Sequence, residues 1–215
     1  MNRTGILAAA AAILLAGCVS IESSPIAGDD REGQILEVLE DMAESQGRGK
    51  RNVSQEDGRL LRLLTETTGA THVVEIGTSN GYSALWLGLA FKETGGKLIT
   101  IEIEPQRARE AQENFEHAEL QNVIESRVND ALKEIPELDE KFDFVFIDAW
   151  KPDYMKYLEL VMPKMKPGGV ITAHNVSSQG GTMRGFLEEI NTNPRMKTTI
   201  DRSSRAGVSI TFIKR

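Results

Sequence analysis

The sequence has few of the residues that build covalent or metal-bound frameworks. Its 215 residues include one cysteine, Cys18, and three histidines. A single cysteine excludes an intramolecular disulfide and a cysteine-based metal site. Aromatic residues make up only 6% of the chain. The apolar run at residues 6–16 is too short to cross a bilayer as a helix.

Basic residues are also outnumbered. The chain has 25 lysines and arginines and 32 acidic residues, which gives a formal net charge of −7. The basic clusters, such as residues 48–51, are short. A surface of this sign repels phosphate backbones, so we expect no nucleic-acid partner. The length is sufficient for one domain with a sizeable core and too small for two comfortable ones.

The N-terminus has the pattern of a bacterial lipoprotein signal. Arg3 precedes the apolar run, which ends in Leu15-Ala16-Gly17-Cys18, a tetrapeptide that resembles a lipobox. This predicts a signal peptide at residues 1–17, a lipidated Cys18 and a tether at residues 18–31. The protein would then lie on the periplasmic side of the cell envelope, touching the membrane only through Cys18. The alternative is an uncleaved N-terminal segment and a cytoplasmic protein.

From residue 32 to residue 215 the pattern is that of one α/β domain. A helical pattern begins near Glu32 and breaks at residues 47–52, and Ser54 is a good N-cap for a second helix. Strands and helices then alternate, which predicts a Rossmann-like, mostly parallel, seven-stranded sheet with helices on both faces. Two successive strands at the end predict one antiparallel strand. The expected strands are residues 72–76, 97–103, 123–128, 142–147, 169–173, 196–200 and 208–213. The expected helices after the second are residues 82–91, 105–118, 130–135, 153–162 and 182–190.

The turn after the first strand contains Gly77 and Gly81, which allow close approach of a ligand to the backbone. By itself this pair is equally compatible with an ordinary tight strand-to-helix turn. Glu102, at the tip of the second strand, is well placed to accept hydrogen bonds from two ribose hydroxyls. Asp130, after the third strand, could reach an adenine amine, could cap the next helix, or could do both.

Four stretches taken together resemble the cation-dependent O-methyltransferases, the family of catechol and caffeoyl-CoA O-methyltransferases. They are residues 73–85, 101–105, 142–151 and 166–176, and the resemblance covers residue 54 to the C-terminus. It implies that the chain binds S-adenosylmethionine. The residues that it places around this cofactor are Glu75, Gly77, Ser79, Gly81, Tyr82, Ser83, Glu102, Asp130 and Asp148.

The reaction that the resemblance implies is methyl transfer to a hydroxyl of a small, catechol-like molecule. Positioning does most of the work in such a displacement. In relatives a divalent cation binds the substrate oxygens and lowers their pKa. By resemblance Asp148 would bind the cation and Lys151 would be the general base. Trp150, Tyr154 and Tyr157 could form an aromatic wall, although we expect Tyr157 in the core.

His174 departs from the family pattern, which has an Asp-Asn pair where this chain has His174-Asn175. A cation site of Asp148, His174 and Asn175 would be poorer for Mg²⁺ and better for Mn²⁺, Fe²⁺, Co²⁺ or Zn²⁺. Alternatively, His174 serves as a general base without a metal. In a third interpretation it only forms hydrogen bonds within the cleft of a weakly active relative.

A function of a different class stays open at this point. The lipobox would place the domain where S-adenosylmethionine has no obvious supply, which favours an envelope-anchored cofactor-binding or interaction protein without catalysis. Members of the family often form dimers, and the helices before Gly69 could supply the interface of a homodimer.

Overall fold

The computed structural model describes residues 30–45 and 52–215. The predicted signal peptide, Cys18 and nearly all of the tether lie outside these residues, so the anchor stays a prediction. Within the two described ranges, no helix is both long and apolar enough to cross a membrane.

A seven-stranded sheet in the order β3-β2-β1-β4-β5-β7-β6 forms the centre of the domain, as predicted. The strand order reverses between β1 and β4, whose carboxyl ends lie side by side. β7 runs antiparallel to both of its neighbours. The strands are β1 His72–Ile76, β2 Lys97–Glu102, β3 Ile124–Val128, β4 Phe142–Ile147, β5 Met165–His174, β6 Met196–Asp201 and β7 Val208–Ile213.

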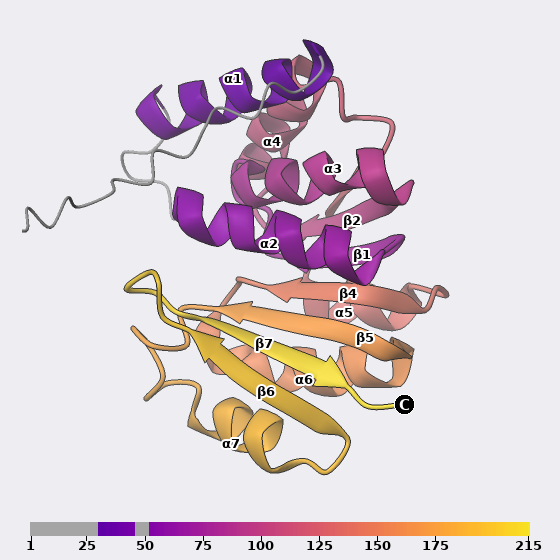
Figure 1. Cartoon of the computed structure of the whole chain (residues 1–215), viewed down its shortest axis with the longest axis vertical. Helices are drawn as coiled ribbons and strands as arrows, with labels where there is room; N and C mark the ends of the chain where they lie inside the picture. Colours follow the sequence, from indigo (N-terminus) through magenta and orange to yellow (C-terminus); the bar gives the residue numbers. More distant parts are fainter. Residues whose placement is uncertain (1–29, 46–51) are drawn as a thin grey trace, which may run out of the picture.

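Helices cover both faces of the sheet (Figure 1). One apolar core lies between the sheet and the helices α1 to α4, and a second lies between the sheet and the helices α5 to α7. The helices are α1 Asp30–Ser45, α2 Gln55–Thr68, α3 Tyr82–Thr94, α4 Pro105–His117, α5 Ala131–Glu137, α6 Tyr154–Val161 and α7 Arg184–Thr192.

The start of α2 is fixed by the N-cap that the sequence predicts. The Ser54 hydroxyl accepts a hydrogen bond from the backbone N–H of Asp57 at 3.1 Å, which satisfies one of the free donors of the first turn. Arg62 joins α2 to α1, because its guanidinium contacts Glu32 at 2.6 Å. These contacts hold the first turn of α2, and with it Asp57, at a defined place over the sheet.

Several predicted boundaries were displaced by one to four residues, and α3 ends at Thr94 rather than at residue 91. β5 begins at Met165 rather than at residue 169, because a bulge lets Phe142 pair with Met165 while Phe144 pairs with Val170. Gly168 adopts φ +91° within this bulge. The last helix begins at Arg184 rather than at residue 182. None of these differences moves the carboxyl end of β5, where His174 lies.

Candidate active site

The loop between β1 and α3 follows a path that depends on residues with positive φ. Gly77, Ser79 and Gly81 have φ of +103°, +50° and +87°. A Cβ on Gly77 would lie 2.4 Å from the carbonyl oxygen of Asp148, so only glycine fits there. The loop is therefore packed directly against the tip of β4.

Glu75, the fourth of the five residues of β1, lies just before this loop. Its two carboxyl oxygens accept hydrogen bonds from the hydroxyls of Ser83 and Thr100, each at 2.5 Å. Burial raises the pKa of Glu75 to about 8 despite these two donors. Glu75 has no exposed surface and Tyr82 is 5% exposed. Both residues are buried next to the loop, and their contact with the cofactor stays a prediction.

Glu102, at the end of β2, faces the same loop. Its carboxylate accepts hydrogen bonds from the backbone N–H of Ser79 at 2.7 Å and of Glu104 at 3.0 Å. The remaining lone pairs of the two oxygens suit a pair of ribose hydroxyls. Beside it, the apolar side chains of Ile103 and Val128 are 62% and 54% exposed. The sequence prediction did not include these two, although apolar side chains at polar strand tips fit a flat adenine ring.

Asp130 caps the helix after β3, one of its two predicted roles. Its carboxylate accepts a hydrogen bond from the backbone N–H of Leu132 at 2.9 Å. The neighbouring Asn129 donates to Glu134 at 2.7 Å rather than toward the loop. Whether Asp130 also reaches the adenine stays a prediction.

Asp148 and Lys151 lie together just after β4, as the resemblance implies. The Lys151 ammonium donates to one Asp148 oxygen at 2.7 Å and to the carbonyl of Ala149 at 3.1 Å. Both side chains are mostly buried, at 15% and 11% exposure for Lys151 and Asp148. The Asp148 backbone N–H donates to Ile76, which holds this turn against β1.

His174, at the end of β5, lies between two carboxylates. Its Nδ1 is 3.1 Å from Asp148 and its Nε2 is 3.1 Å from Asp57 of α2. Burial lowers the pKa of His174, but the hydrogen bonds to Asp148 and Asp57 outweigh burial and raise it to about 9. Burial likewise raises the pKa of each carboxyl, whereas the contacts with His174 bring both pKa values below normal. A protonated imidazole that donates at both nitrogens explains all three directions.

Sequence reasoning missed Asp57. It lies 117 residues from His174 in the chain, and an acidic residue in the first turn of a helix already has a local explanation. The one available signal was its place three residues after the Ser54 N-cap. That place fixes the residue on the inner side of α2, where its side chain is 1% exposed.

The predicted cation site of Asp148, His174 and Asn175 does not fit a divalent cation in the observed arrangement. A histidine ligand needs a free nitrogen lone pair, and both His174 nitrogens face carboxylate oxygens. For the same reason His174 does not offer a lone pair as a general base. In the described part of the chain, no group of three or more His, Cys, Asp or Glu is arranged to hold a metal ion. The third residue of the predicted cation site, Asn175, lies in the turn after β5 with φ +63°.

The aromatic residues near the site divide into two groups. Tyr154 and Tyr157 belong to the core, at 0% and 5% exposure, so the expectation for Tyr157 is confirmed. The Tyr154 hydroxyl donates to the carbonyls of Ile147 and His174, tying the ends of β4 and β5 together. Trp150 is 64% exposed beside Lys151, and only this aromatic of the three is available to a substrate.

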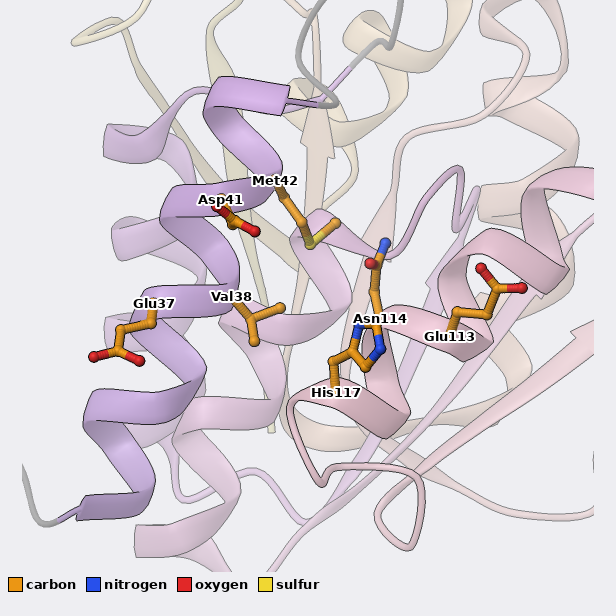
Figure 2. A pocket seen from close by; sticks show the side chains of 7 residues that line it. All are labelled: Glu37, Val38, Asp41, Met42, Glu113, Asn114 and His117. Carbon is orange, nitrogen blue, oxygen red and sulfur yellow. The ribbon is translucent and has the colours of Figure 1, made fainter.

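A hollow of about 600 Å³ lies elsewhere, between α1 and α4. Figure 2 shows its lining, which contains none of the residues predicted for the site. Asn114 connects this hollow to the loop, because its amide donates to the carbonyl of Asn80 at 2.9 Å. The lining residues are Glu37, Val38, Asp41, Met42, Glu113, Asn114 and His117.

The parallel sheet, the reversal of strand order beside β1 and the acidic tip of β2 define a Rossmann-like nucleotide-cofactor fold of the methyltransferase class. The O-methyltransferase family model matches residues 26–209, and the chain belongs to this family.

Named relatives and solved structures agree with this assignment. A catechol O-methyltransferase of Niastella koreensis is 34% identical over 167 residues, which are 76% of this chain and 73% of that protein. A catechol O-methyltransferase of Mycobacterium tuberculosis is 35% identical over 132 residues, 61% of this chain and 60% of that protein. The O-methyltransferase of Bacillus cereus in complex with SAH has a TM-score of 0.76 at 29% identity, with 89% of this chain and 94% of that chain covered.

The structure of a Streptomyces achromogenes O-methyltransferase involved in tomaymycin synthesis, in complex with SAM, has a TM-score of 0.72 at 27% identity. It covers 87% of this chain and 91% of that chain. These likenesses favour the enzyme over a binding protein that keeps only the fold. The protein is an S-adenosylmethionine-dependent O-methyltransferase.

Proposed function

We propose that this enzyme methylates a hydroxyl group of a small aromatic molecule. The observation that carries the proposal is the contact between Gly77 and the backbone of Asp148, which places the Asp148–Lys151 pair beside the cofactor loop. The exposed Trp150 offers an aromatic surface next to this pair. Two of the relatives named above are catechol O-methyltransferases, which supports the same substrate class.

Each of the residues at the strand tips has a separate task. The loop from Gly77 to Gly81 and the carboxylate of Glu102 bind and orient the cofactor. When bound, S-adenosylmethionine supplies an electrophilic methyl carbon on a sulfonium sulfur. Lys151 first releases its own proton to solvent and then takes the proton of the acceptor hydroxyl at Nζ. The acceptor oxygen keeps the electron pair that forms the new C–O bond, while the bond between methyl and sulfur breaks and its electron pair stays on the departing S-adenosylhomocysteine. Asp148 holds Nζ in place.

The substitutions Lys151→Met and Lys151→Arg test the role of Lys151. We expect each to lower kcat by about 10²-fold or more, because arginine keeps the charge but does not accept a proton. The measurement is transfer of labelled methyl from S-adenosylmethionine to catechol. The matched control is Lys156→Met on α6, whose side chain is 62% exposed, with kcat within about two-fold of wild type. If Lys151→Arg keeps wild-type turnover, charge and not proton transfer is the contribution of Lys151.

We also propose that the enzyme is anchored to the envelope through a lipidated Cys18. The support is the Leu15-Ala16-Gly17-Cys18 sequence at the end of the apolar run. We expect Cys18→Ala to release the protein from the membrane fraction of expressing cells. Unchanged membrane association of this variant would contradict the anchor.

A further inference from the structure

His174 connects two parts of the fold that the sequence keeps far apart. One partner, Asp57, comes from the first turn of α2, and the other, Asp148, follows β4. Asp148 uses its second oxygen to accept from Lys151. We call Asp57, His174, Asp148 and Lys151 the four-residue network. The side chains of its members are only 1%, 5%, 11% and 15% exposed, in that order.

Both nitrogens of His174 have partners without an added ion, whereas the second oxygen of Asp57, Oδ1, is buried without a hydrogen-bond partner among the described residues. Each ring nitrogen of His174 has a carboxylate oxygen 3.1 Å away. Such a ring satisfies both carboxylates when it carries a proton on each nitrogen. In the resting enzyme, before Lys151 releases its proton, the network then holds two negative and two positive groups and is neutral. A divalent cation between two carboxylates would give the same balance, with its two charges on the ion instead of on His174 and Lys151.

We infer that the four-residue network takes the place of a divalent cation centre in this enzyme, and that Asp57 is the residue that positions His174 within it. The inference rests on the proposed function for its meaning in catalysis. In physical terms, the charged side chains of the network hold one another in place without a metal ion. Lys151 contacts one oxygen of Asp148, and His174 holds the other.

The first experiment measures binding of Mn²⁺, used alone as a probe, to the full chain by paramagnetic resonance and by thermal shift. We expect wild type to bind no stoichiometric Mn²⁺ and to keep its methyl transfer after treatment with EDTA. His174→Asp would bring a third carboxylate beside Asp57 and Asp148. It should bind Mn²⁺ at least about ten-fold more tightly than wild type, because carboxylates are the ligands that hard cations prefer. His174→Asn is the matched control, since it removes the imidazole without adding a charge.

Two results would overturn the inference. One is a wild-type protein that binds one Mn²⁺ per chain, or that loses activity with EDTA and regains it with a metal. The other is a His174→Asp protein that is folded by circular dichroism yet binds Mn²⁺ no better than His174→Asn. Because Mn²⁺ binding is measured without turnover, an enzyme that methylates no aromatic hydroxyl would contradict the proposed function and leave this result standing.

The second experiment separates positioning by Asp57 from its place in the α2 cap. We expect Asp57→Asn to lower kcat about ten-fold while the Kd for S-adenosylmethionine stays within about two-fold, and Asp57→Glu to recover part of the loss. Ser54→Ala removes the side-chain cap of the same turn but leaves His174 its partner. It should cost about 1 kcal/mol of stability with kcat unchanged. Equal kcat values for Asp57→Asn and Ser54→Ala would reduce Asp57 to a structural role.

Discussion

Two acidic residues of the candidate site, Glu75 on β1 and Asp148 after β4, are both buried but differ in charge. Glu75 is surrounded by the hydroxyls of Ser83 and Thr100, and its pKa rises to about 8, so it is mostly protonated at neutral pH. Asp148 contacts Lys151 and His174, and its pKa falls below the ordinary value despite burial.

This difference shows how the two parts of the candidate site are built, the part around Glu75 and the part around Asp148. On the cofactor side, neutral hydrogen bonds hold a loop in shape, and an ionised carboxylate at Glu75 would be a cost. On the acceptor side, the charge of Asp148 is retained because two cationic side chains offset the loss of hydration. The type of neighbour, rather than the depth of burial, decides the charge of each acid.

The strongest way to break the comparison is Asp148→Asn. The amide presents an N–H group to one of its two donors, so Lys151 or His174 loses its acceptor inside a buried site. We expect kcat/KM for methyl transfer to fall about 10³-fold. The control is Asp143→Asn, the same exchange at the opposite end of β4, with turnover within about two-fold of wild type. A variant at position 148 that keeps a tenth of the activity would contradict this account of Asp148.

Gly77→Ala tests whether the loop after β1 is packed tightly against the turn at Asp148. The added Cβ would lie 2.4 Å from the Asp148 carbonyl at φ +103°, so we expect a loss of about 3 kcal/mol in the free energy of unfolding. Gly95, with φ +65°, has open space around it, and Gly95→Ala should cost only about 1 kcal/mol. Urea denaturation measures both. Similar losses for the two variants would mean that the Gly77 contact with β4 is loose.

The smallest effect concerns the pH dependence of stability. The folded protein keeps the Glu75 proton up to about pH 8, whereas the unfolded chain loses it near pH 4.5. The contribution of Glu75 to stability is therefore fully present below pH 4.5 and is lost as pH rises toward 8. His174, whose pKa is raised from 6.5 to about 9, adds a similar loss only above about pH 6.5.

Between pH 5 and 6.5 the loss of stability thus reports on Glu75. We expect Glu75→Gln, which resembles the protonated acid, to reduce the fall in unfolding free energy over this window by about 2 kcal/mol. Urea denaturation at several pH values gives both slopes. Parallel slopes for the two proteins would show that Glu75 is ionised in the folded state.

Most of the fold could be predicted from the sequence because its signals are local. The alternation of strands and helices, the Ser54 cap and the glycines of the first loop each depend on neighbouring residues, and the structure confirms the sheet that they imply. The start of β5 was missed because a bulge depends on pairing with β4 and not on the residues of β5 alone.

The site was predictable only in part. The position of Glu102 follows from the rule that the carboxyl ends of parallel strands meet at one edge, whereas Asp148 and Lys151 were implied by the family resemblance. The state of His174 depends on Asp57, which reaches it through the packing of α2 on the sheet. No pattern along the chain distinguishes a histidine that binds a metal from one held between two acids, and so the sequence left three alternatives open.

The contact of Gly77 with the Asp148 carbonyl has a consequence for how such an enzyme changes over evolutionary time. The spacing between the Gly77 loop and the turn that follows β4 is set by backbone against backbone. Side chains around the acceptor, such as the exposed Trp150, can be exchanged without altering that spacing. New substrates can therefore be acquired by surface substitutions while this spacing is inherited unchanged.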